Sequence, residues 1–267
     1  MVPLDAVAAE HVRAWLGEPQ SPGLLDLYQA LADHRQGLWG DDPRTPRSVV
    51  LVREGTHQLE AFGAGAVEPA AGWLCRHEGR TVALLAPREW WDAIELRVER
   101  VERVEVVTLA VEASDFRPAS SAVVTRRLTA KDSAAFLASE IAPEWALSGW
   151  RTFRDLAERG AGYVVPFGVG CAAVSWIYSQ AGPYEAIGVA TAARYRRLGL
   201  GKAVASALVA EILEDRGKIP IWTSTPENAA SLATAEALGF SAVASETCLR
   251  WRRVGPRALS GRRDPGA

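Results

Sequence analysis

The segment with the clearest chemical pattern lies between residues 187 and 203 and reads IGVATAARYRRLGLGKA. An apolar strand pattern leads into a short loop, Arg196 to Gly201, and a long helical pattern follows at once. The start of a helix leaves backbone N–H groups unpaired and carries partial positive charge, so it attracts anions. Two glycines allow close approach of a phosphate, and three cations surround them: Gly199, Gly201, Arg196, Arg197 and Lys202. The sequence therefore predicts a phosphate-binding loop.

Two common nucleotide loops do not fit this segment. The dinucleotide fingerprint G-x-G-x-x-G requires a third glycine where this chain has Val204, and the Walker pattern GxxxxGK[ST] is absent. What remains is R-x-x-G-x-G between a strand and a helix. The alternative interpretation is a glycine-rich turn whose arginines face solvent.

The elements that position this loop follow from hydrophobic periodicity and glycine-proline punctuation. Between residues 121 and 252 we expect the order β-α-α-β-β-β-α-β-α-β. The strands are predicted over 121–127, 162–167, 170–179, 184–191, 219–223 and 240–252, and the helices over 130–140, 148–159, 200–215 and 227–238. The strand before the loop, the helix and the next strand form a βαβ unit, so those two strands should be parallel.

The first part of the chain has a weaker rhythm. We expect helices over 1–20 and 23–37, a helix after Pro87, and strands over 48–53, 59–66, 81–86 and 101–112. The polar, proline-containing stretch 114–120 is the best linker. The predicted division is an N-terminal α/β domain over 1–115, a second domain over 121–255, and a flexible tail over 256–267.

Composition limits the classes of function. The chain has 267 residues, 48% hydrophobic and 23% charged, with a net charge of −2, which predicts neither a nucleic-acid nor a membrane partner. No targeting signal or membrane span is apparent, so we expect a cytoplasmic protein, monomeric or homodimeric. Only three of the 30 basic residues are lysine, which suggests a GC-rich bacterial origin. The isolated cysteines Cys75, Cys171 and Cys248 predict no metal site.

Residues 121–252 resemble the GNAT superfamily of N-acetyltransferases. The superfamily's acetyl-CoA motif, [QR]-x-x-G-x-[GA], is matched by Arg196, Gly199 and Gly201, and its next motif by Asn228 and the pair Gly239-Phe240. The resemblance implies an α/β fold, a mixed β-sheet sandwiched by helices, with acetyl-CoA as acyl donor. The predicted strand Ile219 to Trp222 reads IPIW. It resembles the x-P-x-W strand found before the second motif in a bacterial group of this superfamily that has an N-terminal accessory half. Residues 1–115 are then expected to be a diverged, GNAT-like α/β unit.

The resemblance also implies roles for single residues. Backbone N–H groups of the loop would hold the CoA pyrophosphate, which assigns Arg197, Leu198, Gly199, Leu200, Gly201, Lys202 and Ala203 to the cofactor. Val189 and Thr191 would pair with the pantetheine arm through their backbone, and the Val189 N–H would stabilise the oxyanion. Asn228 would contact the cofactor arm, although its position after Thr225-Pro226 also suits a capping box.

Amine acylation requires removal of a proton from the ammonium and support for the leaving thiolate. All four histidines lie before residue 78, so a base in the second half must be a carboxylate, a tyrosine or a water relay. Glu185 is the candidate base because it shares a strand face with Val189 and Thr191; the alternative is a solvent-facing glutamate beside a turn. Many relatives carry a tyrosine acid where this chain has Ala235, so Ser231 or solvent would protonate the thiolate.

The acceptor is the least encoded feature. Trp145, Trp176 and Tyr178 are candidate acceptor-binding residues, with ordinary core aromatics as the alternative. We expect transfer of an acetyl group to a primary amine of a small molecule or amino-acid-like compound. A protein N-terminus or lysine is the alternative acceptor, and a non-catalytic acyl-CoA sensor is the alternative class. A separate activity of the N-terminal histidines has no support from their spacing.

Overall fold

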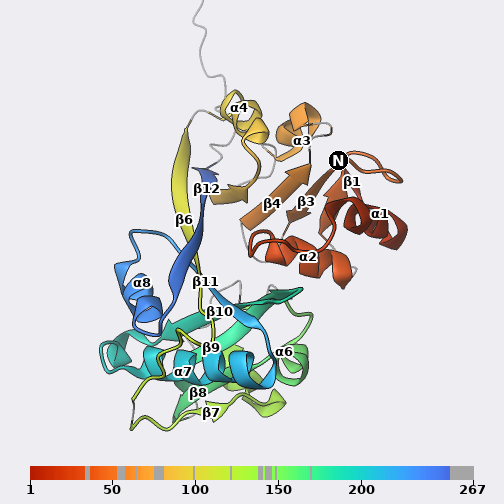
Figure 1. Ribbon diagram of the computed structural model, residues 1–267. Coiled ribbons are helices and arrows are strands. Elements are labelled where there is room, and N and C mark those ends of the chain that lie inside the picture. Colours follow the sequence, from red (N-terminus) through yellow and green to blue (C-terminus); the bar gives the residue numbers. More distant parts are fainter. Residues whose placement is uncertain are drawn as a thin grey trace, which may run out of the picture.

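A computed structural model shows one continuous 12-stranded sheet with helices on its faces (Figure 1). The structure describes residues 1–33, 37–52, 58–63, 65, 67–74, 81–98, 100–120, 122–137, 141, 146–147, 149–168 and 170–252. Among these residues, no helix is long and apolar enough to cross a membrane.

The first half of the chain contributes six strands and most of one end of the sheet. Its strands are β1 (Val2–Pro3), β2 (Leu38–Gly40), β3 (Ser48–Val52), β4 (Gln58–Gly63), β5 (Thr81–Leu85) and β6 (Val101–Ala110). Its helices are α1 (Ala6–Leu16), α2 (Leu25–Ala32), α3 (Val67–Leu74) and α4 (Glu89–Glu95). The parallel pair β4–β5 flanks α3, a helix that the sequence pattern did not reveal.

The second half follows the predicted order closely. Its strands are β7 (Arg126–Arg127), β8 (Gly162–Phe167), β9 (Gly170–Ala181), β10 (Tyr184–Thr191), β11 (Ile219–Ser224) and β12 (Ser241–Arg252). Its helices are α5 (Ser133–Leu137), α6 (Phe153–Arg159), α7 (Leu200–Ala210) and α8 (Ala229–Glu236). Short 3-10 turns η1 (Ala130–Asp132) and η2 (Ala193–Tyr195) precede α5 and the loop, and α7 continues into a π-helical turn, η3 (Glu211–Asp215). The strand predicted over 121–127 is wrong in length, because only β7 pairs with β8.

The sheet has a palindromic strand order. The sequence β1-β2-β3-β4-β5-β12-β6-β11-β10-β9-β8-β7 matches each of β1 to β5 with one of β7 to β11, and β6 with β12. Each half therefore gives its last strand to the other half: β12 pairs with β5, and β6 pairs with β11. Figure 1 shows β6 and β12 running between the two groups of elements. The sheet thus crosses the predicted domain boundary without a break, and the division itself stays a prediction.

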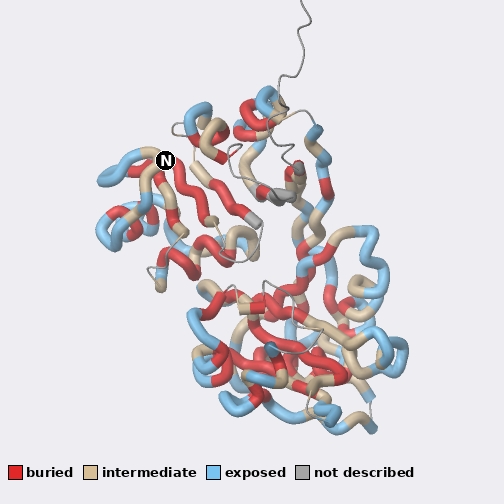
Figure 2. Tube along the Cα trace, turned by 180° about the vertical axis from the view of Figure 1, so that it is seen from behind, coloured by how far each residue is buried: buried red, intermediate tan, exposed pale blue. Residues whose placement is uncertain are grey.

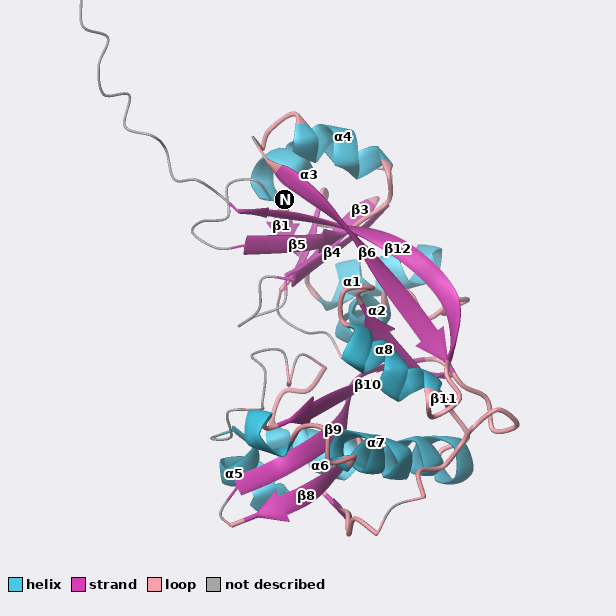
Figure 3. Cartoon of the chain, turned by 90° about the vertical axis from the view of Figure 1, so that its left-hand side faces the viewer, coloured by secondary structure: helices cyan, strands magenta, loops and turns pink. Residues whose placement is uncertain are grey.

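The largest core lies in the second half, against α7. The apolar residues of α7 are buried on the sheet, with Val204, Ala205 and Leu208 fully enclosed. Such a stripe at helical spacing drives the docking of an amphipathic helix. Buried residues gather along the strands of both halves (Figure 2), and α7 lies alongside β8 and β9 (Figure 3). This docking fixes the position of the loop before α7.

The halves also meet through α2, which packs on β9. Leu25 joins Ala186 and Ile221 in a small apolar cluster. The buried amide of Gln29 donates to the Gly149 carbonyl at 2.6 Å and accepts from the Gln180 N–H at 2.9 Å. Because buried amides left unpaired are costly, these bonds fix how α2 sits on β9.

Candidate functional site

Strands β10 and β11 separate in the middle of the sheet. They pair in parallel only through Tyr184–Ala186 and Ile219–Ile221. At the same point the β9–β10 ladder has a β-bulge: the pairing passes from Ala186–Ser179 to Ile187–Ile177, which leaves Tyr178 of β9 as the extra residue. Gly188 lies one residue beyond the bulge, where a Cβ would come within 2.7 Å of the Trp176 ring. Beyond the bulge, the edge of β10 that faces β11 pairs with no strand in the described part of the sheet.

A cavity of about 850 Å³ occupies this separation and reaches the start of α7. Its lining combines β10, the loop after it, and α8. The predicted cofactor residues among the lining are Val189, Thr191, Arg196, Arg197, Gly199, Leu200, Gly201, Lys202, Asn228 and Ser231. The structure thus brings together ten of the predicted residues around one cavity.

The loop between β10 and α7 has the geometry of an anion site. Arg197 has φ 66° and Gly199 has φ 75°, so two residues of the loop are left-handed. A left-handed non-glycine residue is strained, and such strain gathers at functional sites. The first intrahelical bond runs from the Ala203 N–H to the Gly199 carbonyl at 3.0 Å, so the N–H groups of Leu200, Gly201 and Lys202 lack intrahelical partners.

The three cations around the loop have no acidic partner among the described residues. Arg196 makes a long bond from Nε to the Thr191 carbonyl at 3.3 Å. Among the described residues, Arg196, Arg197 and Lys202 form no ion pair. Three unpaired cations at a helix start favour a multiply charged anion such as a pyrophosphate.

Glycine is favoured at the two loop positions for different physical reasons. A Cβ on Gly201 would lie 2.9 Å from the Thr191 Oγ1, so glycine is needed for α7 to approach β10. At Gly199 a Cβ would meet nothing within 4 Å, and only the positive φ favours glycine there. The space beside Gly199 is therefore open to a ligand.

The opposite wall of the cavity comes from β11 and α8. The Trp222 Nε1 donates to the Ser231 Oγ at 2.8 Å, which fixes both side chains at the cavity. Asn228 is itself the N-cap of α8, one turn later than the predicted cap Thr225, and its Oδ1 accepts from the Ser231 N–H at 3.4 Å. This bond uses only the amide oxygen, so the two N–H donors of the exposed Asn228 side chain stay available to a ligand.

An aromatic pair, Phe167 and Tyr195, lies beside the loop. The rings of Phe167 and Tyr195 are 4.8 Å apart, and the Arg194 guanidinium lies 4.9 Å from the Tyr195 centroid. Tyr195 lines the cavity, whereas Phe167 is exposed. The two rings are tilted by 54°, so the pair offers a ring face with a cation above it at the cavity, not a flat platform.

Glu185 lies away from the cavity. Its side chain is buried, and both carboxylate oxygens accept from Arg216, with the Nη2 at 2.6 Å and the Nε at 2.8 and 3.0 Å. The expected strand face is correct, since Glu185 points towards the end of the α7–η3 helix that carries Arg216. Both carboxylate oxygens are thus committed to a charge-assisted bidentate pair that lies outside the cavity lining. This geometry argues against the predicted general-base role.

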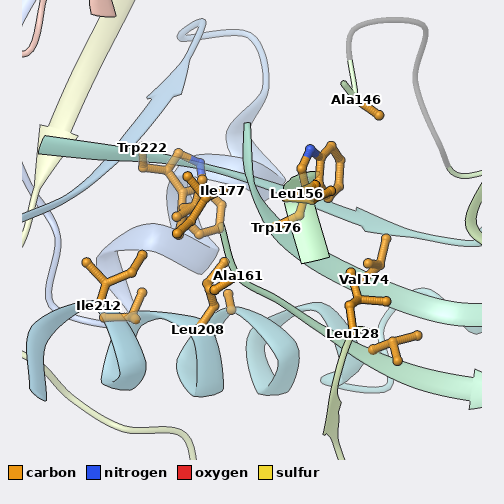
Figure 4. Close-up of a cluster of buried hydrophobic side chains, with 14 of the residues drawn as sticks. Leu128, Ala146, Leu156, Ala161, Val174, Trp176, Ile177, Leu208, Ile212 and Trp222 are labelled. Carbon is orange, nitrogen blue, oxygen red and sulfur yellow. The ribbon is translucent and has the colours of Figure 1, made fainter. Parts of the chain in front are cut away.

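Two of the predicted acceptor residues, Trp176 and Tyr178, do not line the cavity. Trp176 is fully buried in the core, edge-on to Phe136 at 5.6 Å, and Figure 4 shows it near Leu156. Tyr178 packs against the apolar cluster beneath α2. Trp145 lies outside the described residues.

Two predicted cofactor residues also have other settings. Leu198 exposes its side chain and lies outside the cavity lining. Ala203 is buried, and its N–H is already used by Gly199. The predicted pyrophosphate contact of Ala203 is therefore not supported, because a donor inside the helix is not available.

Sequence reasoning missed several lining residues: Ile141, Ala190, Ala193, Tyr195, Trp222, Ala230, Ala233 and Thr234. The IPIW pattern was a usable signal for Trp222, and the helical spacing of Ala230, Ala233 and Thr234 after Asn228 was a signal for one face of α8. Among the described lining residues there is no carboxylate and no histidine.

Comparison with known proteins now bears on this geometry. The GNAT acetyltransferase family matches residues 27–248. The chain belongs to the GNAT acetyltransferase family. The match spans both halves of the sheet, so this GNAT protein carries family sequence on either side of the predicted boundary. A search of curated proteins finds no match.

Solved structures agree with the GNAT-type fold. A GCN5-related N-acetyltransferase-like protein from Streptococcus suis 89/1591 is 21% identical, with a TM-score of 0.69 over 92% of this chain and 100% of that chain. A tandem GNAT protein from the clavulanic acid biosynthesis pathway is 15% identical, with a TM-score of 0.58 over 94% of this chain and 97% of its own. A GCN5-related N-acetyltransferase from Kribbella flavida is 15% identical, with a TM-score of 0.57 over 86% of this chain and 96% of that chain. At such identities the likeness shows the fold alone.

Proposed function

We propose that this GNAT protein transfers the acetyl group of acetyl-CoA to a primary amine of a small molecule or amino-acid-like compound, by direct attack on the thioester. The observation that carries the proposal is the strained, cationic loop at the start of α7, which opens into a cavity of about 850 Å³ between β10 and β11. Membership of an acetyltransferase family supports it.

The residues present fit acetyl-CoA. The N–H groups at the start of α7 and the cations Arg196, Arg197 and Lys202 suit the pyrophosphate. The edge of β10 from Ile187 to Thr191, left without a strand neighbour towards β11, suits the amides of the pantetheine arm. When bound, acetyl-CoA would supply the thioester carbon that the amine attacks.

Each wall of the cavity has a task in this proposal. The Val189 N–H, assigned by resemblance, would donate to the oxyanion that develops on the acetyl oxygen. Ser231, whose hydroxyl oxygen accepts from Trp222 at the cavity, would donate a proton to the leaving thiolate. The stack of Tyr195 and Arg194 would support the adenine.

Removal of the ammonium proton needs another group than Glu185. The described lining holds no carboxylate, and its tyrosine, Tyr195, packs against Phe167 and Arg194. We therefore propose that a water molecule carries this proton to solvent. An amine with a lower pKa would then react faster at neutral pH, because more of it is uncharged.

We also propose that the first half is an accessory, GNAT-like unit that forms one end of the sheet and carries no acetyl-CoA. The palindromic strand order supports the GNAT-like description. The sequence between β4 and α3, Ala64-Gly65-Ala66, contains no arginine or lysine, and Glu68 carries a negative charge in the first turn of α3. Both features support the accessory role.

Thermal stabilisation tests the binding part of the proposal. Acetyl-CoA at about 100 times its Kd should stabilise the wild type by about 2.7 kcal/mol, or several degrees in Tm. Gly199→Glu should lose this shift, because the carboxylate enters the open space of the loop. Gly17→Glu is a matched control, since Gly17 has φ 74° and also no neighbour within 4 Å. No shift in the wild type, or an equal shift in Gly199→Glu, would contradict the proposal.

A second candidate is a non-catalytic acyl-CoA-binding protein. The absence of a carboxylate or histidine from the described lining favours it, as does the buried Ala235 where many relatives carry a tyrosine. Release of free CoA thiol in the presence of a panel of primary amines separates the two. Amine-dependent release supports the transferase, whereas acetyl-CoA binding without release across the panel supports the sensor.

A further inference from the structure

The first half contains its own strand separation at the place that corresponds to the site. Strands β4 and β5 pair in parallel only through Gln58–Glu60 and Ala83–Leu85, a three-residue register that matches the pairing of β10 with β11. Beyond it, Ala61 and Phe62 line a second cavity, of about 270 Å³. The two cavities therefore occupy corresponding places in the two halves of the sheet.

The walls of this smaller cavity are apolar and aromatic. Leu24, Phe62 and Trp91 come from three separate segments, and two residues of β12, Glu246 and Thr247, supply the polar groups. No cationic residue belongs to the described lining. The cavity is thus unsuited to a phosphate and too small for the CoA nucleotide.

Glu246 is the unusual member of this lining. It is partly buried, and among the described residues its carboxylate accepts no hydrogen bond and forms no ion pair. Burial and, second, the nearby charge of Glu60 raise the pKa of Glu246. The Glu60 Oε2 already accepts the Leu27 N–H at 3.0 Å. Two carboxylates near one cavity, one without a partner, make it attractive to a cation.

The backbone at Leu24 is a further feature that favours a ligand site. Leu24 has φ 57°, and Leu24 and Arg197 are the described non-glycine residues with positive φ, one beside each cavity. Backbone strain of this kind is retained where a local geometry is needed. The Arg103 guanidinium lies 5.3 Å from the centroid of the Trp91 ring, so a ligand in the cavity meets the part of this ring that Arg103 leaves uncovered.

We propose that the cavity between β4, β5, α4 and β12 is a second binding site, for a small organic cation with one ammonium group and an apolar body. The ammonium group binds the carboxylate of Glu246, and the apolar body packs against Leu24, Phe62 and Trp91. This proposal does not depend on acetyl transfer in the other half. It assigns to the first half a binding function that needs no phosphate loop.

Calorimetric titration of the full chain tests the proposal with charged and uncharged probes of similar shape. The cations are phenethylammonium and choline, and the uncharged counterparts are 2-phenylethanol and 3,3-dimethylbutanol. We expect at least one cation to bind the wild type about tenfold more tightly than its uncharged counterpart, because only the cation pairs with the carboxylate. Glu246→Gln should remove this preference while the side chain keeps its size.

Two more variants locate the site. Glu102→Gln is the matched control, because Glu102 lies on the neighbouring β6 and is exposed beside Arg250; it should bind like the wild type. Ala86→Leu should fill the cavity and weaken the cation about tenfold or more, whether or not Glu246→Gln folds. No binding of either cation, equal binding of charged and uncharged probes, or unchanged binding in Glu246→Gln and Ala86→Leu would each overturn the proposal.

Discussion

The corner between β10 and α7 and the corner between β4 and α3 hold corresponding places in the palindromic sheet, but they differ in space and charge. At Gly199 a Cβ would meet nothing within 4 Å, whereas a Cβ on Gly63 would overlap the Arg47 carbonyl oxygen and lie 2.9 Å from the Ser48 Cα. The first turn of α3 carries Glu68, which pairs with Arg97. The corner between β10 and α7 is therefore open and cationic, whereas Gly63 at the end of β4 is packed against the backbone at the start of β3.

This difference teaches why a glycine after a strand is a weak signal by itself. Both corners hold a glycine with positive φ at the strand end or the loop, Gly63 at 99° and Gly199 at 75°. Gly63 serves packing against β3, whereas Gly199 leaves room for a ligand. The cations Arg196 and Lys202 distinguish the two in the sequence.

The largest expected effect comes from adding a methyl group to each corner. Gly63→Ala should destabilise the fold by about 3 kcal/mol or more, because backbone atoms must move as well as adopt strain. Gly199→Ala should cost about 1 kcal/mol, from the left-handed backbone alone. Urea denaturation measures both. Equal losses would show that the two corners are packed alike.

The next effect concerns Glu185, whose counterpart in the β4–β5 register is the buried Leu59. If both are packing positions, Glu185→Gln should destabilise the fold by about 3 kcal/mol, because Arg216 loses its charge partner. The kcat of the folded enzyme should change little. A fall of more than about a hundredfold in kcat with unchanged stability would restore Glu185 as the base.

The strained residues of the two cavities allow a paired test of smaller size. Arg197→Gly should stabilise the fold by about 1 kcal/mol and weaken acetyl-CoA about tenfold, since it relieves strain but removes a charge. Leu24→Gly should relieve the same strain but lose the packing of a partly buried side chain, so the fold should become less stable, with no change in acetyl-CoA affinity. Denaturation and calorimetry report the two quantities. Weaker acetyl-CoA binding in Leu24→Gly would mean that the halves are coupled.

The smallest effect is an acid response at the end of the sheet formed by β7. Arg126 holds the pKa of Asp132 at about 2, below its usual 3.8, through bonds of 2.6 and 2.9 Å. A lowered pKa means that this stabilisation is fully present above about pH 4 and is lost as the pH falls through 2. Hydrogen exchange should therefore rise at η1 and β7 in Asp132→Asn at pH 5, and at low pH in the wild type. No change in the variant would show that the pair does not hold the edge.

Much of the second half was predictable because its signals are local. The meander β8 to β10, the loop with Arg196 and Gly199, and the docking stripe of α7 all follow from periodicity within short windows. Helix α3 was missed, since VEPAAGWL has a proline in its third position and no clear cap.

What the sequence hid depends on contacts between distant residues. The period-two rule put Glu185 on the correct face of β10, but it could not reveal Arg216, which is 31 residues away. The exchange of β6 and β12 was also hidden, because an alternating strand does not specify its neighbour. The same exchange brings Glu246 of β12 to the cavity of the first half.

The most direct test of the account is the number of acetyl-CoA molecules that one chain binds, measured by isothermal titration calorimetry. The account predicts one site per chain in the wild type and none in Gly199→Glu. Two sites per chain, or one site that persists in Gly199→Glu, would contradict the claim that only the corner between β10 and α7 holds acetyl-CoA.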